Sequence, residues 1–119
     1  MKERQLEEGE VLILTVLLSR ELDWDRQPVD LRAVRVLDMD DGGMGSLRFT
    51  SGTLDPVFGR TVAEGWFMDD DGLPVMLWLN LDQNDDLFEL DSWKVDSSPR
   101  RRLPRAKSEV LDGDPRAAY

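Results

Sequence analysis

The chain has 119 residues and a formal net charge of −10, and 40% of its residues are hydrophobic. This length fits one domain, and this apolar content supports a core without disulfides or metals. Because cysteine and histidine are both absent from the sequence, thiolate catalysis, zinc–thiolate sites and imidazole acid–base chemistry are excluded.

The charge is unevenly distributed along the chain. Residues 1–99 carry 22 acidic against 9 basic side chains, whereas residues 100–119 carry 3 acidic against 6 basic ones. Acidity of this kind disfavours direct binding of nucleic acid, whose phosphates would be repelled, and it favours a basic protein partner. The alternative is that the acidic residues only keep the protein soluble.

The first element that the sequence predicts is a helix over residues 6–19. Glu8 and Glu10 stand in its first turn, where acidic side chains suit the positive end of the helix dipole. Seven of the eight residues from 11 to 18 are apolar. Such a helix is buried on two sides, by the sheet and by the rest of the core or the C-terminal segment, or else by a second subunit or partner. A strand is the alternative, because several of these residues are β-branched.

Alternation of apolar and polar residues predicts five strands after a polar connection over residues 21–30. The expected strands are residues 33–39, 45–50, 61–68, 73–81 and 87–95. Turn-forming residues separate them and join them into one hairpin and a three-stranded meander. The predicted fold class is therefore α+β, with one N-terminal helix packed on a mostly antiparallel sheet of about five strands.

The composition changes after residue 99. Residues 1–99 are expected to form a single α+β domain with a loose lead-in over residues 1–5. Residues 100–119 are basic and punctuated by proline, which predicts a flexible or surface-lying C-terminal tail. The alternative is that the arginines fold back on the acidic body or contact a partner.

Acidic and aromatic side chains recur at alternate positions of two predicted strands. Glu89, Asp91 and Trp93 share one strand face, and Glu64 and Trp66 form a similar pair. Tryptophan is enriched at binding hot spots, and acidic groups steer basic partners. The expected partner-binding residues are Glu64, Trp66, Glu89, Asp91, Trp93, Asp69, Asp70 and Asp71.

Two other interpretations of these residues stay open. Glu89 and Asp91 could form a solvated sheet face that pairs with basic residues across the strands, such as Arg35, Arg48 or Lys94. The tryptophans could equally fill the core.

The acidic turns also raise the question of metal or carboxylate chemistry. Asp82, Asn84 and Asp86 match the first ligand positions of an EF-hand loop, but Leu87 stands where glycine is needed and Trp93 where a bidentate glutamate is needed. Paired carboxylates could serve glycoside hydrolysis, but nothing in the sequence marks a sugar-binding cleft. We therefore expect that the chain has no catalytic, cofactor or metal site and that it is not an enzyme.

The longest apolar run, residues 11–18, is too short to span a bilayer. The chain does not open with a basic and then apolar signal peptide. We therefore expect a cytoplasmic protein without a membrane partner.

Residues 87–99, L-F-E-L-D-S-W-K-V-D-S-S-P, carry a family resemblance together with residues 71–75 and 79–82. They resemble a family of small bacterial proteins of unknown function with the hallmark L-F-E-L-D-x-W-K-V-D-x-S-P, and residues 7–18 are similar to that family's acidic, leucine-rich opening helix. The resemblance covers roughly residues 4–100 and implies no catalytic residues.

Small acidic proteins of this kind are often immunity partners of secreted bacterial toxins, an analogy of size and charge. The expected function is thus an acidic protein-binding module, an immunity or inhibitor protein that occludes a basic toxin domain such as a nuclease or deaminase. The alternatives are a structural or regulatory homodimer and a carboxylate- or metal-dependent enzyme.

Overall fold

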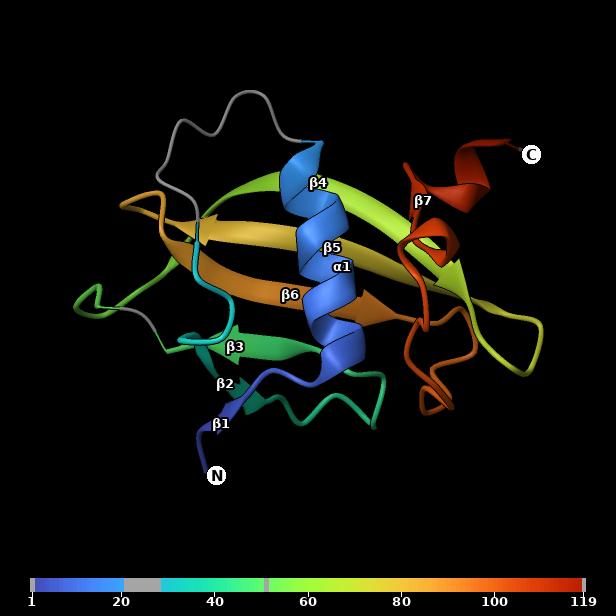
Figure 1. Cartoon of the computed structure of the whole chain (residues 1–119), viewed down its shortest axis with the longest axis horizontal. Helices are drawn as coiled ribbons and strands as arrows, with labels where there is room; N and C mark the ends of the chain where they lie inside the picture. The colour runs from blue at the N-terminus through green and yellow to red at the C-terminus, as the bar shows by residue number, and fades with distance from the viewer. Residues whose placement is uncertain (1, 21–28, 51, 119) are drawn as a thin grey trace.

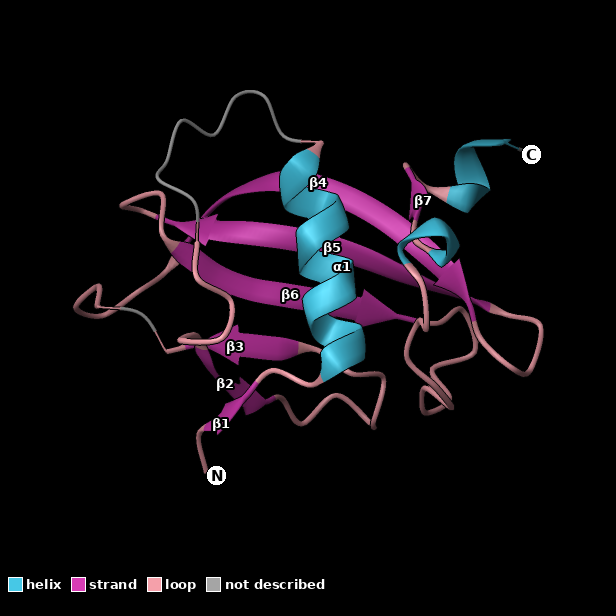
Figure 2. Cartoon of the chain, viewed as in Figure 1, coloured by secondary structure: helices cyan, strands magenta, loops and turns pink. Residues whose placement is uncertain are grey.

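The computed structural model describes residues 2–20, 29–50 and 52–118. In these residues one α-helix, α1 (Glu8–Ser19), lies across one face of a seven-stranded antiparallel sheet (Figures 1 and 2). The strands are β1 (Arg4–Gln5), β2 (Arg35–Asp38), β3 (Leu47–Phe49), β4 (Phe58–Met68), β5 (Pro74–Asp82), β6 (Leu87–Trp93) and β7 (Leu111–Asp112). Two 3-10 helices, η1 (Lys107–Glu109) and η2 (Pro115–Ala118), follow β6 in the chain.

Most of the polar connection predicted at residues 21–30 lies outside the described residues. Within the described part of the chain, no helix has the length and the apolar content that crossing a membrane requires.

The predicted α+β class is confirmed, and the number of strands is corrected from about five to seven. The hairpin is β2–β3 and the meander is β4–β5–β6, and β3 pairs with β6 to join them in the order β1-β2-β3-β6-β5-β4-β7. The two additional strands, β1 and β7, have two residues each and lie at the two edges of the sheet. Two residues are too few to show alternation, so only pairing with a neighbouring strand reveals them.

The core lies between α1 and the facing side of the sheet. Alternate residues of β5, including Leu77 and Leu79, are at most 1% exposed and point toward the helix side. On α1, Leu14 and Leu17 are fully buried. A Cβ atom added at Gly65 of β4 would lie 3.0 Å from Leu17 Cδ2, so the absence of a side chain there lets the helix approach the sheet closely.

The C-terminal segment, from residue 100 onward, packs against the rest of the chain. Pro104 and Val110 are buried, and β7 pairs with the end of β4. At Gly9 a Cβ atom would come within 2.4 Å of Leu103 Cβ, so this segment covers part of the second side of α1. The helix is therefore buried on two sides, as its apolar sequence predicts, by the sheet and by the C-terminal segment.

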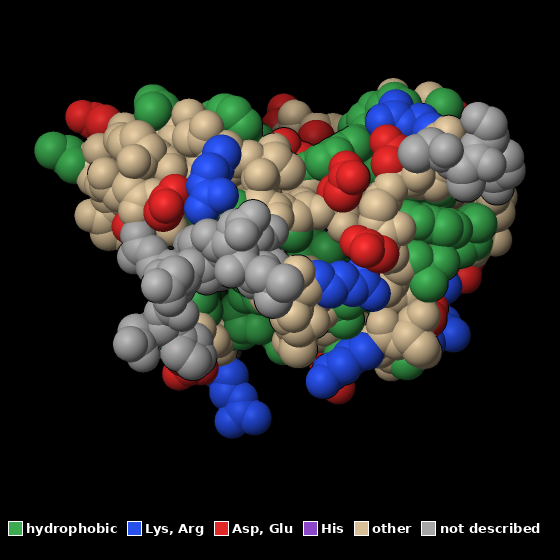
Figure 3. All heavy atoms as spheres, turned by 90° about the horizontal axis from the view of Figure 1, so that it is seen from above, with side chains coloured by type: hydrophobic (Ala, Val, Ile, Leu, Met, Phe, Trp, Pro, Cys, Tyr) green, Lys and Arg blue, Asp and Glu red, His purple; other side chains and the backbone are tan. Residues whose placement is uncertain are grey.

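Arginines of this segment also fold back on the acidic residues of the domain. The Arg102 guanidinium pairs with Asp70 at 3.0 Å and with Glu109 at 2.6 Å. Such pairing distributes positive charge over an acidic protein. On the side of the molecule shown in Figure 3, acidic and basic side chains are accordingly interspersed.

Candidate functional site

The sheet face opposite α1 gathers most of the predicted partner-binding residues. Glu64 and Asp91 lie on either side of Trp78, and Trp66 and Trp93 lie on either side of Met76. Side chains directly opposite each other on neighbouring strands share a face of the sheet. We call this surface the outer face and define it by Glu64, Trp66, Trp78, Glu89, Asp91 and Trp93.

All three tryptophans of the outer face are half-buried, so they neither fill the core nor stand free in solvent. Met76, which lies between Trp66 and Trp93, is only 2% exposed because the neighbouring side chains cover it. Each of these tryptophans is therefore partly packed and partly exposed. Their inner edges pack on the sheet, and their outer edges remain available for contact.

The acidic turn Asp69–Asp71 has a different role from the outer face. Asp69 is buried, and Asp69 Oδ2 accepts hydrogen bonds from Lys94 Nζ and from the backbone N–H of Arg101, both at 2.9 Å. Lys94 Nζ also donates to Asp71. Lys94 is itself 0% exposed, so these three charges form a buried ion cluster. Asp69 therefore lies away from any contact surface, while Asp70 stays exposed beside Arg102.

The pKa values in this cluster follow from burial and pairing. Burial by itself raises the pKa of Asp69, but the hydrogen bonds from Lys94 and from two backbone N–H groups outweigh it and hold that pKa below its ordinary value. Burial lowers the pKa of Lys94, and the bonds to Asp71 and Asp69 more than reverse this. The cluster is thus fully ionised at neutral pH.

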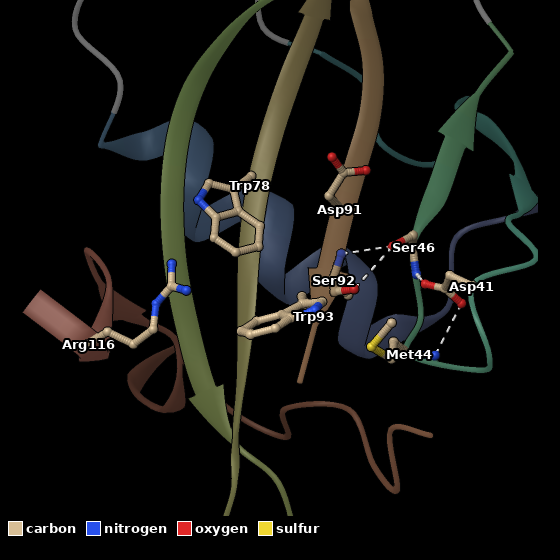
Figure 4. Close-up of a pocket in the computed structure, with 8 residues that line it drawn as sticks. All are labelled: Asp41, Met44, Ser46, Trp78, Asp91, Ser92, Trp93 and Arg116. Carbon is tan, nitrogen blue, oxygen red and sulfur yellow. Dashed lines mark hydrogen bonds between the residues drawn. The ribbon is translucent and has the colours of Figure 1, made fainter. Parts of the chain in front are cut away.

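An open hollow of about 450 Å³ lies on the outer face, beside the loop of the β2–β3 hairpin (Figure 4). It is lined by Asp41, Met44, Ser46, Trp78, Asp91, Ser92, Trp93 and Arg116. The backbone N–H of Ser92 donates to Ser46 Oγ at 2.9 Å, and Ser46 Oγ donates to the Ser92 carbonyl at 3.2 Å. These hydrogen bonds connect the two chain segments beyond the last paired residues of β3 and β6. Ser46 and Ser92 form one wall of the hollow.

Two carboxylates of the outer face differ in their surroundings. Glu89 is paired with Arg48, whose Nε donates to it at 3.1 Å, as one of the two open interpretations expects. Asp91 accepts a hydrogen bond from Asn80 Nδ2 at 2.9 Å. Burial raises the pKa of Asp91, and the negative charge of Glu89 raises it further. An additional cation would therefore stabilise the ionised form of Asp91.

A cation of the chain itself reaches this hollow. The Arg116 guanidinium lies over the Trp93 ring, 5.4 Å from its centroid, and Asp114 holds it with a contact of 2.7 Å. In Figure 4 the Arg116 side chain points toward Trp78 and Trp93. The geometry is that of a cation–π contact at the rim of an acidic, aromatic hollow.

Sequence reasoning did not find several of these features. Asp41, Met44 and Arg116 reach the hollow from segments that are remote in sequence, so no local pattern marks them. Lys94 is different, because alternation places it on the opposite face from Trp93, toward the core. This alternation indicates that Lys94 faces the core, but its partners Asp69 and Asp71 lie in a segment remote in sequence and are identified only by the structure.

The acidic turn over residues 82–86 has a structural role. Asp82 Oδ1 accepts hydrogen bonds from the backbone N–H of Asn84 at 2.8 Å and of Asp86 at 3.1 Å. Aspartate commonly stabilises turns in this way. Across the residues that the structure describes, no group of three or more acidic side chains is placed to hold a metal ion.

The fold and the site together define an α+β domain with a helix on one sheet face and a cluster of aromatic and acidic side chains on the other. The chain belongs to the family described as Domain of unknown function (DUF6984), whose family model matches residues 3–104. No curated protein and no solved structure gives a significant match to the chain.

Proposed function

We propose that this protein is a protein-binding module that recognises a basic partner protein through its outer face. The observation that carries this proposal is the position of Trp66, Trp78 and Trp93, all half-buried on the sheet face that α1 does not cover. Indole groups in such positions leave apolar area in contact with water. A cluster of them is typical of a surface that a partner covers.

The charge of the surface supports a basic partner. Glu64 and Asp91 flank the central Trp78, and the whole chain has a formal net charge of −10. Long-range attraction of this kind accelerates the encounter with a basic protein, and the tryptophans then provide the short-range contact.

The more specific proposal is an immunity or inhibitor protein that occludes a basic toxin domain, such as a nuclease or deaminase. Such a function requires neither histidine nor cysteine, and the chain has none. It requires a surface that is already formed before binding, which the regular strands β4, β5 and β6 provide. The analogy of size and charge adds an associational argument.

The test is capture of the partner with tagged full-length protein from the native cell, followed by elution with a salt gradient. We expect one basic protein to be released only at high salt, because the interaction depends on charge. Glu64→Lys should weaken the purified complex at least about ten-fold, because like charges then face each other across the interface. Glu3→Lys makes the same charge change at an exposed position outside the outer face and is the matched control.

Either of two results would overturn the proposal. One is an unchanged affinity for the Glu64→Lys variant when its fold is intact. The other is the absence of any captured protein combined with a dimer in light scattering, which would favour the homodimer.

A further inference from the structure

The hollow on the outer face has the chemistry of a site for a planar cation. Trp78 and Trp93 provide aromatic surface, Met44 provides a polarisable thioether, and Asp91 provides a carboxylate (Figure 4). Cations bind over indole rings, and guanidinium groups also stack on them. A neutral ligand would gain only a hydrogen bond from the carboxylate, and an anionic ligand would be repelled by it.

The Asp91 carboxylate can accept further hydrogen bonds. Among the described residues, Asn80 Nδ2 donates a hydrogen bond to Asp91 Oδ2 at 2.9 Å. A guanidinium presents parallel N–H groups that match a carboxylate, which an ammonium does not. Burial and the negative charge of Glu89 raise the pKa of Asp91, although Arg48 acts in the opposite direction, so a further positive charge close to Asp91 would stabilise the ionised carboxylate.

Arg116 shows which group the hollow accepts. Its guanidinium lies 5.4 Å from the centroid of the Trp93 ring. A guanidinium group of the chain itself thus already contacts the hollow. The Arg116 side chain is 57% exposed, so it is only partly packed, although Asp114 accepts hydrogen bonds from its Nε at 3.1 Å and from its Nη2 at 2.7 Å. An arginine from outside could therefore replace it at little cost in packing.

We propose that the hollow is a binding site for an arginine side chain of the partner protein, and that Arg116 occupies its rim until that arginine replaces it. This inference rests on the proposed function for the source of the arginine, but the site itself is testable without the partner. Arg116 then acts as an intramolecular competitor that lowers affinity and raises selectivity. A partner that presents an arginine displaces it, and a surface with only lysines gains less.

The test is a titration of the ¹⁵N-labelled full-length protein with N-acetyl-arginine amide, followed through the indole N–H signals of Trp78 and Trp93. N-acetyl-citrulline amide has nearly the same shape without the charge and is the matched control ligand. We expect saturable shifts of both indole signals with the arginine compound and no saturable shift with the citrulline compound.

Three variants assign the effect to the site. Arg116→Ala should bind the arginine compound about two- to five-fold more tightly, the range that an exposed cation–π contact contributes. Asp91→Asn should weaken binding by a larger factor, because a charge-assisted hydrogen bond is lost. Asp55→Asn removes a charge from an exposed loop residue outside the hollow and should bind like the unmodified protein.

Equal binding of the arginine and citrulline compounds, or unchanged affinity in Arg116→Ala, would overturn the inference. If the arginine compound binds as expected but no partner is captured, the site stands and the proposed function fails. If a partner is captured and its affinity does not change with Asp91→Asn, the function stands and this site is wrong.

Discussion

Substitution of Lys94 by methionine removes the positive charge at the centre of the buried ion cluster. Methionine keeps much of the length of the side chain, so the change is mainly electrostatic. The side chains of Lys94 and Asp69 are both 0% exposed, and their charged atoms lie 2.9 Å apart. In the variant, Asp69 keeps its backbone N–H donors but loses the positive charge of Lys94 that offsets its burial. Removing one partner of a buried pair costs about 3–5 kcal/mol.

This cost is a large fraction of the total, because small domains have free energies of unfolding of about 5–15 kcal/mol. Urea unfolding followed by tryptophan fluorescence measures it as a lower midpoint with an unchanged slope. Arg60→Ala is the control, because it breaks a partly exposed pair with Asp85 at 3.3 Å and should cost at most about 1 kcal/mol. Asp69→Asn in the Lys94→Met background should recover part of the loss, since it removes the unpaired buried charge.

The same substitution should loosen the C-terminal segment, because Asp69 also accepts hydrogen bonds from the backbone N–H groups of Arg101 and Arg102. Hydrogen exchange at these two amides reports this directly. A loss below about 1 kcal/mol for Lys94→Met, equal to that of the surface control, would refute the account of the cluster as a buried ion pair.

Three further outcomes follow from individual contacts. Gly9→Ala should destabilise the protein in thermal unfolding, because the new Cβ would lie 2.4 Å from Leu103 Cβ and clash with it. Helix propensity alone predicts the opposite, a gain of about 1 kcal/mol. A higher melting temperature of the variant would contradict the clash. The pKa of Asp69 is lowered in the folded state. The stabilisation that ionised Asp69 contributes is therefore complete above the pKa of an unfolded aspartate and is lost as the pH falls through the folded pKa. In an Asp69→Asn variant, the melting temperature should fall less steeply as the pH is lowered. Arg4→Ala should cost about 1–3 kcal/mol in urea unfolding, because Glu10 is 1% exposed and loses the guanidinium that donates to it at 2.8 Å; unchanged stability would show that Glu10 needs no cation.

The sequence alone determined the features that depend on local periodicity. Alternation along residues 73–81 places the leucines of β5 on the core side and Trp78 on the other, as the structure confirms. The acidic first turn and the apolar content of residues 11–18 indicate a helix buried on two sides, and α1 begins at Glu8 and ends at Ser19. Strand direction and side-chain period are properties of neighbouring residues, so a short window of sequence contains them.

The tertiary structure alone decided which remote segments meet. The pairing of β3 with β6 brings the hairpin loop with Met44 beside Trp93. The C-terminal segment places Arg116 over Trp93 and Leu103 against Gly9. These contacts depend on the order of the strands and on how the whole chain closes around one core, and no local period encodes that order. The outer face was therefore predictable as a set of strand positions, whereas the hollow within it, the in-chain cation at its rim and the buried lysine cluster below it emerge only when the chain is packed.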